Sequence, residues 1–264
     1  MQGMKSIYAL MVAGATACLV AEAAPVSNAA REAQAKANEY KGAVVNCDMG
    51  WAVDSMYPLH KWTLADRLAS RNPREERENA LRIMGAQGYR ESDEVARRRM
   101  ERNIRALRAE YVRIGQGMKD AGFRVERYAV GTPVAEYVLP HSAAALRAVR
   151  NDSVRSGRTQ NSASLSRADE IKWEGGVSRL VVLPTTLWYS VPTESGRRMR
   201  VERKDFIYAV RDEKIQATNN RNYRGTELNK WYFIDGNTDV NTLRSYFPTL
   251  PLNLARPDTG ERPL

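Results

Sequence analysis

The feature that most constrains the fold is a long apolar stripe that ends where an alternating pattern begins. Between Ser92 and Gly122, apolar residues recur at steps of four and three: Met100, Ile104, Leu107, Tyr111, Ile114, Met118 and Ala121. This period places them on one face of a helix. Ser92 suits an N-terminal cap and Gly122 a C-terminal stop. The spacing predicts an amphipathic helix from Asp93 to Ala121.

After Gly122 the chain alternates apolar and polar residues, which is typical of strands. Strands are predicted at Phe123–Val130, Val134–Leu139, Arg179–Val191, Met199–Arg211 and Lys230–Ile234. A helix followed by antiparallel strands predicts an α+β fold, with the long N-terminal helix packed in a curved sheet. A coiled-coil seam is the alternative for the stripe, but the immediate change to a strand pattern favours packing on a sheet.

A helix held in such a sheet would be covered by strand residues of one alternation parity. The candidates for this inner face are Tyr128, Val130, Leu187, Tyr189, Tyr208, Val210 and Phe233. Buried tyrosine hydroxyls need a partner or water, so they suit the mouth of a cavity. The predicted ligand-binding residues are therefore Tyr128, Tyr189, Tyr208 and Phe233. The alternative is that these rings simply fill a core.

The N-terminus has the features of an export signal. A charged start is followed by an apolar run from Ile7 to Val20, too short for a membrane span, and then by Ala21-Glu22-Ala23. We expect a signal peptide over residues 1–23 and a periplasmic or secreted mature chain without a transmembrane span. Lipidation at Cys18 is the alternative.

The mature chain is expected to have three parts. Residues 24–43 carry little large apolar surface, and a flexible or weakly structured segment is expected over residues 24–60. Residues 61–255 are expected to form the α+β domain, and residues 256–264 a C-terminal tail. Cys47 would be the only remaining thiol, and its apolar neighbours predict that it is buried.

No motif in the sequence identifies catalysis, a cofactor or a metal site. His60 and His141 are the only histidines, and both are expected to be surface or loop residues. Neither has further ligands at the spacing that zinc requires. The carboxylates of Glu126, Glu136, Asp205 and Asp235 could meet in space, but nothing selects them.

The stretch Asp235-Gly236-Asn237-Thr238-Asp239 superficially resembles a calcium loop. Counting from Asp235, the sixth and twelfth positions should hold glycine and glutamate, but they hold Val240 and Tyr246. The sequence instead predicts an Asp-Gly turn that ends a strand, and a short helix capped by Thr238 or Asp239.

The same region carries a resemblance. Residues 231–236, W-Y-F-I-D-G, with Leu243-Arg244 and the run 247–251, F-P-T-L-P, resemble the C-terminal signature of exported bacterial proteins of uncharacterised function. An upstream V-L-P-T run at 182–185 belongs to the same pattern. The plan is similar to NTF2-like (cystatin-like) α+β cones. The resemblance implies this fold and an exported protein, but no specific activity.

The net charge of +10 favours anionic partners. Acidic residues interspersed with the arginines do not favour nucleic acid. We expect a non-enzymatic binding module that holds a small apolar ligand, a peptide or a partner protein. The alternative is a structural or antagonist protein whose basic surface binds an anionic envelope component or a secreted toxin. A hydrolase or isomerase built in the cone is a third hypothesis.

Overall fold

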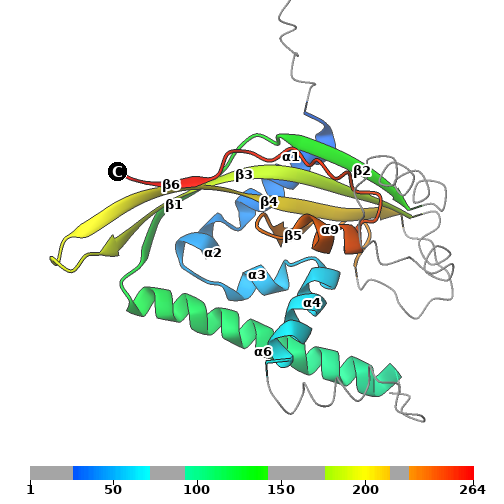
Figure 1. Ribbon diagram of the computed structural model, residues 1–264, viewed down its shortest axis with the longest axis horizontal. Coiled ribbons are helices and arrows are strands. Elements are labelled where there is room, and N and C mark those ends of the chain that lie inside the picture. The colour runs from blue at the N-terminus through cyan, green and yellow to red at the C-terminus, as the bar shows by residue number, and fades with distance from the viewer. Residues whose placement is uncertain (1–25, 72–92, 142–175, 215–225) are drawn as a thin grey trace, which may run out of the picture.

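The computed structural model describes residues 26–71, 93–141, 176–214 and 226–264, and it confirms the α+β class (Figure 1). The helices are α1 (Asn28–Glu39), α2 (Lys41–Val45), α3 (Gly50–Asp54), α4 (Pro58–Ala69), α6 (Asp93–Asp120) and α9 (Val240–Tyr246). The strands are β1 (Arg124–Val130), β2 (Ala135–His141), β3 (Gly176–Pro192), β4 (Arg198–Lys214), β5 (Tyr232–Asp235) and β6 (Gly260–Pro263). The five strands predicted from alternation match β1 to β5.

The six strands form one antiparallel sheet built around a long hairpin. β3 and β4 pair along their whole length, and Gly196 takes a positive φ of 77° in the turn between them. β1 and β2 pair with the two halves of β3, while β5 and β6 pair with the two halves of β4. β6 lies within the expected C-terminal tail, so this part of the chain belongs to the sheet.

Each face of the sheet has its own core. On one face, Val181, Leu183 and Ala209 pack with Phe233 and with helix α1. On the other face, the buried residues pack with α9 and with the segment that leads into α4: Leu180, Val182, Tyr208, Val210, Ile234, Tyr57, Leu243 and Phe247. Strand alternation produces this division because successive side chains point to opposite faces.

Helix α6 has almost the predicted bounds, but the expected packing is wrong. It follows four other described helices, and its main contacts are with α4 and α3 (Figure 1). In the expected stripe Leu107 is buried, whereas Ile114 is 41% exposed. The next buried position is Gly115 instead. Only glycine fits there, because a Cβ would lie 2.3 Å from the Cys47 carbonyl oxygen. The close approach of this loop therefore turns the helix away from the predicted face, and a cone around α6 is not observed.

Residues 28–60 are also more ordered than expected. Ser27 caps α1 by accepting a hydrogen bond from the Ala30 amide at 3.0 Å. Ala30, Ala33 and Ala37 are buried against the sheet. Alanine favours helix and lets a helix approach closely, so little large apolar surface is needed for this contact. The alanine-rich composition that indicated a flexible segment instead belongs to a helix packed closely on the sheet.

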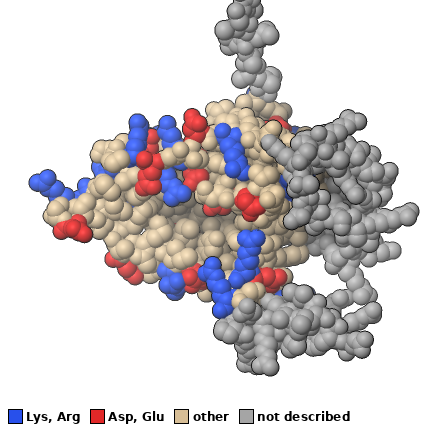
Figure 2. Space-filling model, in the orientation of Figure 1, with Lys and Arg blue, Asp and Glu red and all other residues tan. Residues whose placement is uncertain are grey.

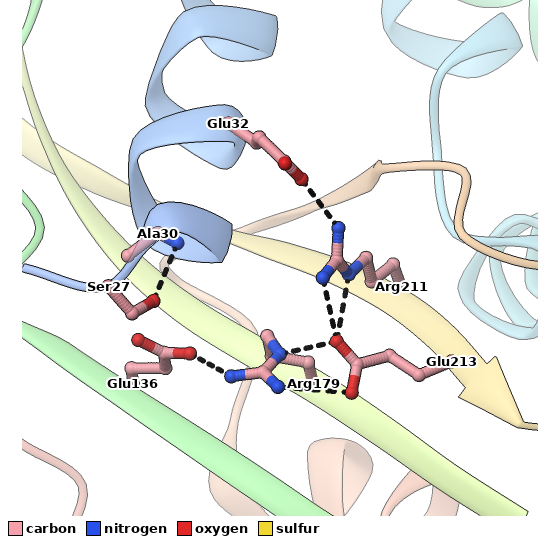
Figure 3. A network of polar contacts seen from close by, with 7 residues as sticks. All are labelled: Ser27, Ala30, Glu32, Glu136, Arg179, Arg211 and Glu213. Atoms are coloured by element: carbon pink, nitrogen blue, oxygen red, sulfur yellow. Dashed lines mark hydrogen bonds and ion pairs between the residues drawn. The ribbon is translucent and has the colours of Figure 1, made fainter.

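A charge network holds the start of α1 to the sheet (Figure 3). Arg211 on β4 bonds Glu32 of α1 at 2.7 Å and Glu213 at 2.8 Å. Arg179 on β3 bonds the same Glu213 at 2.5 Å and also pairs with Glu136 on β2. Arg179 lowers the pKa of Glu213 by hydrogen bonding. Every charged member has an opposite partner, so the network joins four elements.

Cys47 is buried, with 6% of its surface exposed, as predicted. No helix within the described residues is long and apolar enough to cross a membrane. The predicted signal peptide at residues 1–23, including Cys18, lies outside the described residues.

Candidate functional site

A pocket opens between the helices and the sheet face that carries α1. Its cavity volume is about 460 Å³. Strands β1, β4 and β5 contribute one wall through Tyr128, Ile207 and Phe233, and helices α3, α4 and α6 contribute much of the other. Five aromatic residues line it: Tyr40, Trp51, Tyr111, Tyr128 and Phe233.

Three of these rings pack against one another at the inner wall. Tyr40, in the junction of α1 and α2, stacks on Trp51 of α3 with centroids 4.5 Å apart and planes 8° apart. Tyr40 also meets Phe233 of β5 edge-on at 5.3 Å. These contacts fix the rings in place, so the wall is preformed rather than assembled around a ligand.

The tyrosine hydroxyls of the pocket have unused hydrogen-bonding capacity. Those of Tyr40, Tyr111 and Tyr128 make no hydrogen bond with any other described residue. Burial raises the pKa of Tyr128 to about 12 and also raises that of Tyr111. All three hydroxyls are therefore protonated at neutral pH, and each can donate to or accept from a bound molecule.

His60 is a buried residue of α4, with 5% of its surface exposed, so the prediction of a surface or loop position was wrong. Its Nδ1 lies 3.4 Å from the Tyr246 hydroxyl of α9. Burial lowers the pKa of His60 to about 4, against the smaller opposite effect of Asp235. The imidazole is consequently neutral at pH 7. His141 ends β2, and its side chain lies outside the described residues.

The polar mouth of the pocket is the turn that superficially resembles a calcium loop. Asp235 accepts a hydrogen bond from the Asn237 amide at 2.7 Å, and Asp239 caps α9 through the Thr242 amide at 2.8 Å. Gly236 is required because a Cβ would lie 2.2 Å from the Phe206 carbonyl oxygen. The predicted turn and cap are both confirmed. No group of three His, Cys, Asp or Glu side chains suited to a metal gathers in the described ranges.

The four predicted ligand-binding residues separate in space. Tyr128 and Phe233 line the pocket. Tyr208 is fully buried in the core on the opposite face of the sheet. Tyr189 lies farther along β3, where its ring stacks on Phe123 and its hydroxyl bonds Glu261.

The pairing register explains the position of Tyr208. Ala209 pairs with Phe233, so Tyr208, next to Ala209 in the strand, points to the other face. The predicted inner face therefore combined residues from both faces of the sheet. Val210, like Tyr208, lies in the core on the opposite face. The strands could be found from alternation, but their relative register could not.

Sequence reasoning missed Tyr40, Trp51 and His60 as pocket residues. All three lie in the segment 24–60 that was expected to be flexible, and only their aromatic character could have drawn attention to them. Tyr111 was recognised as part of the apolar stripe of α6 but was assigned to packing.

The candidate carboxylates do not meet. Glu126 pairs with Arg200, Glu136 with Arg179 and Asp205 with Arg203. Of the four, only Asp235 lines the pocket.

Comparisons with known proteins leave this geometry as the main basis for a function. The chain matches no protein-family model, no curated protein sequence and no solved structure at a significant level.

Proposed function

We propose that this protein is a non-enzymatic binding module that holds a small molecule in the aromatic pocket. The observation that carries the proposal is a cavity of about 460 Å³ lined by five aromatic residues. This volume lies within the usual range for ligand pockets, which combine apolar walls with a few polar groups. Tyrosine hydroxyls that bond to no other described residue, together with the polar 235–242 turn, supply those groups here.

We also propose that the protein acts after export, in the periplasm or outside the cell. This follows from the signal-like residues 1–23 and from the resemblance of the 231–251 segment to exported bacterial proteins. Kinship with NTF2-like cones is part of the same proposal and rests on that signature alone.

The test is native mass spectrometry of the protein purified from its own source, with two matched variants. Ala52→Leu adds side-chain volume at the pocket wall, whereas Ala106→Leu adds the same volume on the exposed side of α6. The wild type and Ala106→Leu should retain a small molecule, and Ala52→Leu should lose it. The proposal would be contradicted if the wild type carried no adduct and if an extract of small molecules gave no thermal stabilisation.

Surface binding is the second candidate. The chain carries a net charge of +10, and Arg102 and Arg105 are exposed on α6 without an ion pair to any other described residue. These groups could bind an anionic envelope component or a secreted toxin. On the face shown in Figure 2, however, basic and acidic groups are interleaved. Retention of a small molecule that Ala52→Leu abolishes favours the pocket over this surface.

A further inference from the structure

We infer that the pocket takes a small organic cation of the ammonium type, with Asp235 as its counter-charge and the aromatic rings around it. This inference rests on the proposed function, because it names the chemical class of the ligand held by the same pocket. Two independent features support it: the charge balance of the mouth and the aromatic lining.

Asp235 is a carboxylate without a cationic partner. It accepts a hydrogen bond from the Asn237 amide but makes no ion pair with any other residue that the structure describes. Burial is the main cause of the lowered pKa of His60 on α4 and of the raised pKa of Tyr111 on α6; the negative charge of Asp235 opposes the first shift and adds to the second. The field of this carboxylate therefore reaches pocket residues on two different helices.

Among the described residues that line the pocket, the single guanidinium does not offset this charge alone. The pocket is lined by two carboxylates, Asp235 and Asp239, and by Arg67. Hydrogen bonds from Thr242 are the main cause of the lowered pKa of Asp239, and the Arg67 charge adds to them. Arg67 also acts on His60, against Asp235. Lys36 and Lys230, which both act on Tyr40, are ion-paired with Glu39 and Glu227. In a chain with a net charge of +10, the described residues of this mouth therefore carry more negative than positive charge.

The aromatic lining favours the same class of ligand. A cation within about 6 Å of a ring centroid is attracted by the negative face of the ring, and this attraction reaches about 2 kcal/mol when the cation is desolvated. Quaternary ammonium groups are bound in this way by aromatic cages. Tyr111 and Tyr128 can also accept hydrogen bonds from a protonated amine through their hydroxyl oxygens.

A neutral apolar ligand fits the same volume less well. It would gain nothing from the exposed Asp235 carboxylate, whereas an ammonium ligand is attracted by this negative charge. An anionic ligand would meet one cationic side chain among the described lining residues, Arg67, and would be repelled by two carboxylates.

The test compares each cation with a neutral molecule of the same shape by calorimetry. The probes are choline and acetylcholine, each against the analogue in which a tert-butyl group replaces trimethylammonium. The cation should bind at least about tenfold more tightly than its analogue, because the Asp235 carboxylate and the ring faces both attract the charge. Asp235→Asn should clearly reduce this difference, because the amide keeps the Asn237 hydrogen bond but not the charge.

Asp258→Asn is the control, since it makes the same charge change at an exposed position outside the pocket and should preserve the difference. Equal affinity for cation and analogue, with both lost in Ala52→Leu, would overturn the inference that the ligand is a cation. The proposal of a binding module would still stand. A difference that survives Asp235→Asn would overturn the assigned counter-charge. Absence of binding by all four probes also overturns the inference, and the native mass then decides whether the binding module stands.

Discussion

His60 shows at the residue scale how burial changes the chemistry of a side chain. The same imidazole would have a pKa near 6.5 in an unfolded chain, but burial in the pocket lowers it to about 4. Protonation therefore favours the unfolded state between these two pH values, and the free energy of unfolding must fall as pH decreases through this window. Above pH 6.5 both states hold a neutral imidazole, so the effect disappears.

We predict a pH-dependent loss of stability that depends on His60. Between pH 6.5 and 4 the wild type should lose up to about 3 kcal/mol of unfolding free energy, from the size of the pKa shift. His60→Gln keeps a polar side chain but cannot titrate, so its stability should change less between pH 6.5 and 5, before most carboxylates titrate. Urea denaturation over this range measures both slopes. An imidazole proton NMR signal that disappears in His60→Gln but titrates near pH 6.5 in the wild type would contradict the prediction.

At the scale of elements, α1 shows how a helix can be held by small residues and charges instead of large apolar side chains. Ala33 is fully buried, and it packs in the core that contains Val181 and Leu183 of β3. The Arg211–Glu32 ion pair lies nearby (Figure 3). Because Glu32 is 61% exposed, this pair contributes little free energy, and the alanine contact is the stronger determinant. The distance between helix and sheet is therefore set by methyl groups.

A matched pair of substitutions tests this contact. Ala33→Leu should destabilise the protein by about 1–3 kcal/mol, because added methylenes in a filled core force the helix away from the sheet. Ala35→Leu makes the same chemical change on the exposed side of α1 and should alter stability by less than about 0.5 kcal/mol. Chemical denaturation of both variants measures the difference. Similar effects from the two variants would show that α1 does not pack as described.

At the scale of the whole molecule, the sequence predicted the elements better than their assembly. Strands β1 to β5, helix α6 and the cap at Asp239 follow from local periodicity and local hydrogen bonds, so the chain itself specifies them. The division of Tyr208 and Phe233 between two faces depends on register, which involves residues far apart in sequence. The pocket combines Tyr40, Trp51 and Tyr111 with the sheet, so only Tyr128 and Phe233 could be anticipated. Packing of α6 on α3 and α4 likewise depends on tertiary contacts such as the one at Gly115.

The location of the whole molecule decides which ligands it can meet. The charged start, the apolar run to Val20 and the Ala21-Glu22-Ala23 site predict removal of residues 1–23 during export. This cut lies before Ser27, which caps α1, so the described fold would be kept intact. Intact-mass measurement on the envelope and secreted fractions should find a chain that begins at Ala24.

Two variants separate the possible routes of processing. Ala23→Arg places a large charged residue where signal peptidase requires a small one, and it should leave residues 1–23 attached. Cys18→Ser should be cleaved like the wild type, since the thiol has no role in cleavage after Ala23. A lipid adduct present in the wild type and absent from Cys18→Ser would establish the lipoprotein route instead. Recovery of the wild type from the envelope with Met1 still attached would contradict cleavage, and the pocket would then act on a chain that keeps its apolar N-terminus.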